Sequence, residues 1–335
     1  MKHVVRRVAL AVLAVGATLP FAAPAFAQAY PAKPITVVVP FTAGGPTDTV
    51  ARSLAAAMSK PIGQSVVVEN VGGAGGTVGA ARVKNAAPDG YTVLLHHIGM
   101  STAPALYRKL AYNPLTDFEM VGLVVDVPMT LIARADFPAK NYAEFVAYVK
   151  ANKAKMNYAN AGIGAASHLC GLLFMSSIET DVTTVPFKGT ADVMNALLGK
   201  QVDFSCDQTT NTTGQIQANA ADPAKGVKVY AVTSARRVAT LPNVPTLQEL
   251  GLKGFEVGVW HGVYAPKGTP KEVIDKLVAA VQAAAKDPEF TKRMADLGAT
   301  VYGADKMNPA AHAAQLKAEI DKWGPIIKRA GAYAD

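Results

Sequence analysis

The sequence predicts an α/β fold in which two lobes are joined by two crossing strands and enclose a cleft. Three observations predict it. Runs of apolar, β-branched residues alternate with segments of helical composition, which is typical of parallel strands connected by helices. The same alternation restarts near the middle of the chain, and two long apolar segments lie between the two blocks. The chain has 335 residues, 50% hydrophobic and 17% charged, so it can bury a large core, which excludes intrinsic disorder.

The first 27 residues predict a removable signal peptide. Lys2, Arg6 and Arg7 form a basic start, residues 8–19 are an apolar run too short to span a membrane, and residues 25–27 match the small-x-small cleavage rule. A buried N-terminal helix is the alternative interpretation. No Cys stands directly after the cleavage site, and no later apolar stretch is long enough for a span. We therefore expect a periplasmic protein, cleaved near Ala27, that is not inserted in the membrane.

The charge of the chain argues against nucleic acid as a partner. The formal net charge is +8, and subtracting the three basic residues of the signal peptide leaves +5 without any basic cluster. Aromatic residues make up only 7%, so a base-stacking platform has little support. Mild positive charge suits small acidic molecules instead.

Strands and helices are expected in two blocks. Strands are predicted over 35–40, 66–69, 91–96, 128–134, 156–159, 183–187, 202–206, 229–233 and 257–265. Helices are predicted over 47–59, 142–154, 165–178, 191–198, 270–285 and 309–330, the last ended by Gly331. The candidate crossing strands are 129–134 and 257–265. Lobe I would then be discontinuous, residues 30–128 plus 256–335, and lobe II would be residues 129–255.

Two cysteines remain after cleavage, Cys170 and Cys206. In an oxidising compartment an even pair is typical of one disulfide. It would close a loop of about 36 residues and contribute roughly 3–4 kcal/mol in the loop-entropy model. Two buried free thiols are the alternative.

The segment 40–48, PFTAGGPTD, predicts a strand that passes through a glycine loop into a helix. Glycines allow a close approach of backbone to ligand, Pro46 suits a helix start, and a helix N-terminus favours an anion. An ordinary tight turn is the alternative. The second half offers a matching junction at 160–168, NAGIGAASH, and a third turn at 187–191, FKGTA. Two helix N-termini facing one cleft would be complementary to a molecule with two carboxylates.

Motifs for catalysis, nucleotides and metals are absent from the sequence. The glycines of 72–79 fit neither a dinucleotide fingerprint nor a P-loop, which leaves a cleft wall or a packed loop. Ser167 and His168 are neighbours that would diverge on a helix, and no GxSxG elbow exists. His96 and His97 are adjacent, and His261 follows Trp260, but no further ligands stand near them at the spacing of a metal site. Asp207 and Gln208, placed just past a predicted strand, could accept a ligand amine or cap the next turn.

Several long stretches resemble the Bug family of periplasmic solute-binding receptors of the tripartite tricarboxylate transporter type. They are PFTAGGPTDTVAR (40–52), VENVGGAGGTVGAARVKNAAPDGYTVLL (68–95) and VPFKGTADVMNALLGKQVDF (185–204). Four further stretches resemble the aspartate-binding, BugD-type branch of that family more narrowly. They are HHIGMSTAPALYRKL (96–110), ASHLCGLLF (166–174), CDQTTNTT (206–213) and VWHGVYAPKGTP (259–270).

The resemblance implies a type II periplasmic-binding-protein fold that closes on its ligand. Family members hold one carboxylate through backbone groups and ordered water from two loops, which match 41–48 and 160–168. The third turn and Asp207 would complete the pocket, and Asp207 or Asp48 would meet the ammonium of an amino-acid ligand. The candidate ligand-binding residues are Phe41, Thr42, Ala43, Gly44, Gly45, Thr47, Asp48, His97, Gly99, Asn160, Ala161, Gly162, Gly164, Ala165, Ser167, His168, Lys188, Gly189, Thr190 and Asp207.

The expected function is that of a receptor without enzymatic activity or cofactor, which captures an acidic amino acid such as aspartate or a dicarboxylate. Its expected partners are the membrane components of a tripartite tricarboxylate transporter. Three alternatives stay open: an aromatic or tricarboxylic ligand, a sensor role with a membrane kinase, and an exported hydrolase.

Overall fold

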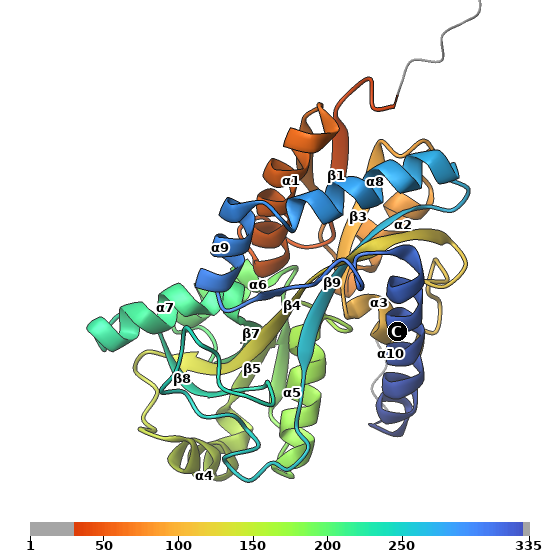
Figure 1. Cartoon of the computed structure of the whole chain (residues 1–335). Helices are drawn as coiled ribbons and strands as arrows, with labels where there is room; N and C mark the ends of the chain where they lie inside the picture. The colour runs from red at the N-terminus through yellow and green to blue at the C-terminus, as the bar shows by residue number, and fades with distance from the viewer. Residues whose placement is uncertain (1–29, 331–335) are drawn as a thin grey trace, which may run out of the picture. The chain divides into compact units, whose positions relative to one another are not determined.

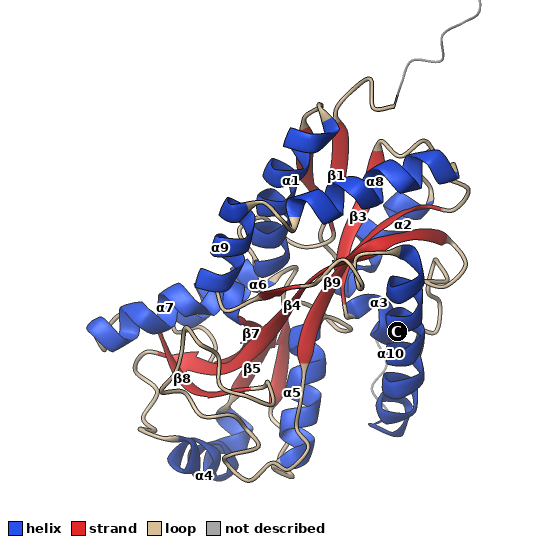
Figure 2. Cartoon of the chain, viewed as in Figure 1, coloured by secondary structure: helices blue, strands red, loops and turns tan. Residues whose placement is uncertain are grey.

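A computed structural model describes residues 30–330, and the elements below lie in the compact unit that begins at Pro31. The expected signal peptide, its cleavage site and the helix stop at Gly331 lie outside the described residues. Helices and strands alternate along most of this unit (Figures 1 and 2).

The strands form one mixed sheet and the helices cover it. The strands are β1 (Ile35–Val39), β2 (Val66–Asn70), β3 (Thr92–His97), β4 (Phe118–Arg134), β5 (Asn157–Asn160), β6 (Thr183–Pro186), β7 (Phe204–Gln208), β8 (Val227–Val232), β9 (Gly258–Pro266) and β10 (Thr300–Val301). The α-helices are α1 (Pro46–Ile62), α2 (Thr77–Lys84), α3 (Gly99–Leu106), α4 (Tyr142–Asn152), α5 (Ala166–Ser177), α6 (Thr190–Leu198), α7 (Thr209–Ala221), α8 (Lys271–Ala284), α9 (Pro288–Asp296) and α10 (Pro309–Ala330). Two 3₁₀ turns, η1 (Ala74–Gly76) and η2 (Lys153–Lys155), complete the set.

The sheet repeats one strand order in its two halves. The strands follow the order β2-β1-β3-β9-β4-β7-β5-β6, with β8 also paired to β4. In the first half, β2, β1 and β3 run parallel, β9 pairs antiparallel with β3, and β4 pairs antiparallel with β9. In the second half, β6, β5 and β7 run parallel, β4 pairs antiparallel with β7, and β8 pairs antiparallel with β4. In each half the fourth strand arrives from the other half, which is the arrangement of a type II periplasmic-binding-protein fold and confirms the predicted fold class.

The long strand β4 corrects two details of the sequence prediction. A strand was expected only over 128–134, whereas β4 begins at Phe118, and its first part pairs with β9 from Phe118↔Pro266 to Pro128↔Gly258. Its second part pairs with β7 and β8. The central strands are therefore antiparallel, and only the outer three of each half follow the expected parallel pattern, because β4 and β9 run in opposite directions between the halves.

Thr233 connects the strands where the chain passes between the halves. Its Oγ1 accepts a hydrogen bond from Met129 N at 3.1 Å and donates one to Val257 O at 2.6 Å. Its backbone N–H donates to Met129 O at 2.9 Å. Because Thr233 is fully buried, this small network fixes the start of the crossing segments relative to each other.

Four helices are missing from the sequence prediction: α2, α3, α7 and α9. Helix α7 reads TTNTTGQIQANAA, rich in residues of low helix propensity, and α3 contains Pro104. The segment 72–79, expected as a cleft wall or a packed loop, forms η1 and the start of α2. It packs closely on the β5–α5 loop, since a Cβ on Gly75 would lie 1.9 Å from Ile163 O.

Candidate functional site

A buried cavity lies where the chain leaves the carboxyl ends of β1, β3, β5 and β7. The residues that line it are Phe41, Pro46, Thr47, His97, Ala161, Ala165, Ala166, Ser167, Thr190, Asp207 and Gln208. They come from both halves of the sheet, although no Lys or Arg is among them. The enclosed volume is about 10 Å³, room for at most one water molecule. Any ligand larger than a water molecule therefore needs the loops around the cavity to move apart.

Four helices begin at this cavity. Their N-cap residues are Gly45 for α1, Ala165 for α5, Gly189 for α6 and Gln208 for α7, and none of the four makes a side-chain cap bond within the described chain. Among the other helices, α4 and α9 are capped by the side chains of Asn141 and Asp287, whereas α2, α3 and α8 also have no side-chain cap bond. First-turn N–H groups of the four helices are thus left without a side-chain acceptor. A helix N-terminus carries about half a positive charge, so these groups suit carboxylates.

Asp48 holds the first loop in shape rather than lining the cavity. Its Oδ2 accepts hydrogen bonds from Gly44 N at 2.9 Å and from Arg52 Nε at 2.8 Å, and its Oδ1 accepts one from Asn70 Nδ2 at 2.9 Å. Burial alone would raise the pKa of Asp48, but these three donors outweigh it and keep the pKa below its ordinary value. The carboxylate is ionised and its oxygens are occupied by the protein's own donors.

The second loop is shaped by its own side chains. Ser167 Oγ accepts a hydrogen bond from Ala161 N at 2.9 Å, and Asn160 Oδ1 accepts one from Gly162 N at 2.9 Å. Burial lowers the pKa of His168 to about 4, so its ring is neutral at pH 7. The loop therefore presents backbone groups and a hydroxyl to the cavity, not a charge.

Phe41 and His97 form one wall of the cavity. Their rings stack with centroids 4.7 Å apart. The Nδ1 of His97 accepts a hydrogen bond from Gly99 N at 3.0 Å, which places the proton of the neutral ring on Nε2. Burial holds the pKa of His97 well below its ordinary value, so the ring is a neutral donor.

Asp207 and Gln208 are the last two residues of β7, not residues past its end. Asp207 Oδ1 accepts a hydrogen bond from Gln208 N at 2.8 Å, and Oδ2 accepts one from the amide of Asn211. Burial raises the pKa of Asp207 to about 7, although its donors, including Thr190, work against that shift. Asp207 thus both lines the cavity and supports the first turn of α7.

Two hydrogen bonds join the first half of the sheet to the second beside the cavity. Tyr107 OH donates to Ile163 O at 2.6 Å, and Thr102 Oγ1 donates to Gly164 O at 2.8 Å. The backbone of the second loop also meets η1, since a Cβ on Gly162 would lie 2.9 Å from Gly75 N. These contacts close the space around the cavity.

The structure brings eight of the twenty predicted site residues to the cavity wall. They are Phe41, Thr47, His97, Ala161, Ala165, Ser167, Thr190 and Asp207. The others belong to the same loops without lining the cavity: Thr42, Ala43, Gly44, Gly45, Asp48, Gly99, Asn160, Gly162, Gly164, His168, Lys188 and Gly189. Lys188 is solvent-exposed.

Three lining residues are missing from the predicted set. Pro46 and Ala166 lie inside the two predicted loops, so the loop pattern already contains the signal for them. The sequence offers Gln208 beside Asp207 as an acceptor for a ligand amine, but the predicted set contains only Asp207, whereas both residues line the cavity.

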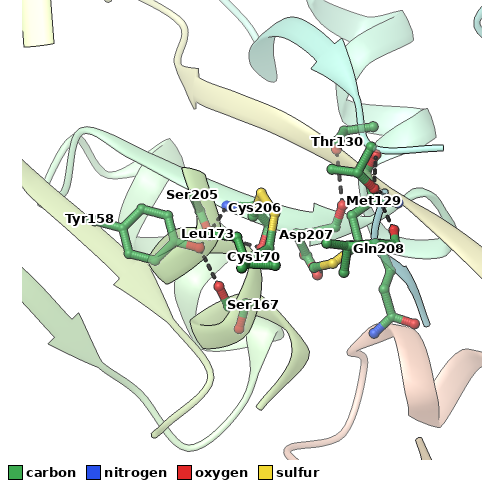
Figure 3. The surroundings of a disulfide bond; sticks show 12 residues. Met129, Thr130, Tyr158, Ser167, Cys170, Leu173, Ser205, Cys206, Asp207 and Gln208 are labelled. Atoms are coloured by element: carbon green, nitrogen blue, oxygen red, sulfur yellow. Dashed lines mark hydrogen bonds between the residues drawn. A yellow bond between two sulfur atoms is a disulfide. The ribbon is translucent and has the colours of Figure 1, made fainter. Parts of the chain in front are cut away.

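Cys170 on α5 and Cys206 on β7 form the predicted disulfide, with Cα atoms 6.0 Å apart (Figure 3). Tyr158 lies beside it and connects the same two elements. Its hydroxyl donates to the Ser167 carbonyl and accepts from Cys206 N at 3.3 Å. The bridge thus ties the start of α5 to the end of β7, both of which line the cavity.

Between residues 30 and 330, no cluster of three or more His, Cys, Asp or Glu side chains is placed to hold a metal ion. Over the same part of the chain, no helix has the length and apolar character needed to cross a membrane.

The fold and the buried cavity between its two sheet halves define a periplasmic-binding-protein class of receptor. A family model, "Tripartite tricarboxylate transporter family receptor", matches residues 50–332, and the chain belongs to this family of periplasmic solute-binding proteins. The resemblance to the Bug family is thereby confirmed.

Three relatives place the chain more closely. A UPF0065 protein from the TAR-I ttuE-ttuC' intergenic region of Agrobacterium vitis is 48% identical over 322 residues, which cover 96% of this chain and 91% of the relative. The solved structure of the periplasmic binding protein BugD is 56% identical with a TM-score of 0.88, covering 91% of this chain and 99% of BugD. MatC of Rhodopseudomonas palustris, solved with bound malate, is 42% identical with a TM-score of 0.85, covering 89% of this chain and all of MatC.

Proposed function

We propose that this protein is an extracytoplasmic receptor for a small dicarboxylic acid, either an acidic amino acid such as aspartate or a four-carbon diacid. One observation carries the proposal: four helix N-termini without side-chain caps meet at a buried cavity that no Lys or Arg lines. Backbone N–H groups and helix dipoles would then neutralise the carboxylates. The malate bound to MatC supports a ligand of this size and charge.

Within this proposal, Asp207 is the better candidate than Asp48 to compensate a ligand ammonium. The oxygens of Asp48 are held by Arg52, Gly44 and Asn70, and Asp48 is not part of the cavity wall. Asp207 is fully buried in that wall. Its negative charge would gain most from a nearby cation, because an opposite charge lowers the cost of burying an ionised carboxyl.

The receptor would bind by closure of two lobes, residues 30–128 plus 256–335 against residues 129–255. The ligand would favour the closed state because it contacts loops of both lobes at once. The protein would catalyse no reaction. After export and cleavage near Ala27, the closed form would be presented to the membrane components of a tripartite tricarboxylate transporter, and a pull-down from membranes would separate this role from that of a sensor kinase subunit.

Thermal unfolding tests the proposal on the chain from residue 28 onward under non-reducing conditions. The panel is aspartate, glutamate, succinate, malate, citrate, nicotinate and terephthalate. A ligand at 100 times its dissociation constant adds about 2.7 kcal/mol to the unfolding free energy and raises the midpoint by several degrees. We expect shifts with four-carbon diacids. A shift only with citrate, nicotinate or terephthalate would reject the proposed ligand class but not the receptor, whereas turnover of an ester would favour a hydrolase.

A further inference from the structure

Gln208 presents an unpaired acceptor to the cavity. It is 3% exposed, forms part of the cavity wall, and stands at the junction of β7 with α7. Its side-chain amide extends away from the disulfide, toward the pale red ribbon of the N-terminal part of the chain (Figure 3). Within the described residues, its buried Oε1 has no hydrogen-bond partner.

The neighbouring polar side chains of the wall already have partners. Thr47 Oγ1 lies 3.2 Å from His261 Nε2, and Ser167 Oγ accepts from Ala161 N at 2.9 Å. The two Asp207 oxygens accept from Gln208 N and the Asn211 amide. A buried acceptor without a donor is destabilising, so Gln208 Oε1 would gain its first donor from a ligand, whereas the Asp207 oxygens already accept from the protein.

The rest of the cavity offers mainly donors. The helix N-termini and His97 Nε2 suit carboxylate oxygens, which accept hydrogen bonds and cannot satisfy an acceptor. A ligand with an N–H or O–H group next to a carboxylate can donate a hydrogen bond to Gln208 Oε1. The adjacent Asp207 carboxyl adds negative charge on the same side, which favours an ammonium over a hydroxyl.

We propose that Gln208 is the specificity-determining residue of this receptor, and that it selects diacids carrying an ammonium or hydroxyl group beside a carboxylate over the unsubstituted diacid. This inference rests on the proposed function. It names the class of ligand more narrowly than charge alone does, since a site built to pair a ligand N–H or O–H rejects the analogue that lacks it.

Titration calorimetry with aspartate, malate and succinate tests it, because the three acids share a four-carbon skeleton and differ only at C2. In the wild-type protein we expect aspartate to bind most tightly and succinate most weakly. In Gln208→Met, which keeps the length of the side chain and removes the acceptor, the preference for aspartate over succinate should fall about tenfold while succinate affinity changes less than about twofold. Gln217→Met, at an exposed position of α7, is the matched control and should change neither.

The outcomes separate the two proposals. If the wild-type protein binds succinate as tightly as aspartate and malate, the proposed function stands and the role of Gln208 is rejected. An equal loss of affinity for all three acids in Gln208→Met would also reject it, because the amide would then donate to a carboxylate or support the fold. If none of the three acids binds, the four-carbon ligand class and the inference fall together.

Discussion

Tyr107 and Ile163 join the two halves of the sheet through one hydrogen bond, from the tyrosine hydroxyl to the isoleucine carbonyl at 2.6 Å. Tyr107 follows α3 in the first half, and Ile163 lies in the β5–α5 loop of the second. Thr102 donates in the same direction to Gly164 O at 2.8 Å. The loop that lines the cavity is thus held from outside by side chains that do not line it.

Removing the Tyr107 hydroxyl should speed ligand release. Under the proposed closure this bond would form only in the closed state, and a hydrogen bond of this kind contributes about 1 kcal/mol, so Tyr107→Phe should raise the dissociation rate roughly fivefold. Stopped-flow fluorescence of the ligand-loaded protein measures that rate. Tyr302→Phe, a tyrosine outside the cavity wall, is the control. An unchanged rate in Tyr107→Phe would show that the bond does not hold the bound state closed.

Gly162 and Gly44 should respond differently to replacement by alanine. Both adopt left-handed backbone, with φ of +101° and +80°. A Cβ at Gly162 would also lie 2.9 Å from Gly75 N, whereas a Cβ at Gly44 meets nothing within 4 Å. Gly162→Ala therefore keeps the halves apart and should lower affinity more than tenfold. Gly44→Ala carries only a backbone strain of about 1–2 kcal/mol.

Calorimetry gives the affinities of both glycine variants, and circular dichroism checks that both still fold. Equal affinities in the two variants would contradict the proposed contact between the β5–α5 loop and η1. Loss of folding in Gly162→Ala would move the effect from ligand binding to stability.

These loops also show what the sequence could predict. The junctions at 40–48 and 160–168 were found because glycine and proline have local backbone consequences that need no tertiary contact. The last helix, Pro309–Ala330, was predicted with its observed bounds. Its signal is also local, because its apolar residues recur at helical spacing. Local chemistry is therefore enough to locate the two loops that line the cavity.

Tertiary contacts explain what was not predicted. In the first part of β4, Glu119 and Asp126 flank the apolar run 120–125, and pairing with β9 continues the strand through both acidic residues. Helix α7 has low intrinsic propensity and is supported by Asp207 at its start. Tyr107 donates to the backbone carbonyl of Ile163, which is distant in sequence. Every residue has such a carbonyl, so the residue type of Ile163 does not indicate the contact.

The affinity for aspartate should rise between pH 6 and pH 8, whereas the affinity for succinate should fall. Burial raises the pKa of Asp207 to about 7, so its carboxyl loses its proton across this range. The ionised form attracts the ligand ammonium and repels a ligand that carries only carboxylates. Calorimetry at four pH values measures both trends.

Other groups around Asp207 do not titrate in that window. Asn211 on α7, Thr190 on α6 and Thr130 on β4 carry no charge. Burial raises the pKa of Tyr158 on β5 and lowers that of His97 on β3, so both stay neutral. Asp207→Asn should flatten both pH trends. Parallel trends for the two ligands in the wild-type protein would assign the pH dependence to another group.

Removing the disulfide should lower the unfolding free energy strongly and change the affinity for the ligand little. Cys170 and Cys206 are 36 residues apart, and replacing both by alanine should lower the unfolding free energy by roughly 3–4 kcal/mol in the loop-entropy model. The site should survive, because the Tyr158 hydroxyl still links the Ser167 carbonyl to the backbone of residue 206. Denaturant unfolding and calorimetry on the double variant measure the two effects.

Tyr158→Phe in the alanine background then separates the two links between α5 and β7. With both links gone, the first turn of α5 and the end of β7 are no longer fixed to each other, and affinity should fall about tenfold further, the equivalent of about 1.4 kcal/mol. The same substitution with the disulfide intact should cost little affinity. If the double alanine variant alone loses binding while still folded, the disulfide itself positions the cavity wall, and Tyr158 does not substitute for it.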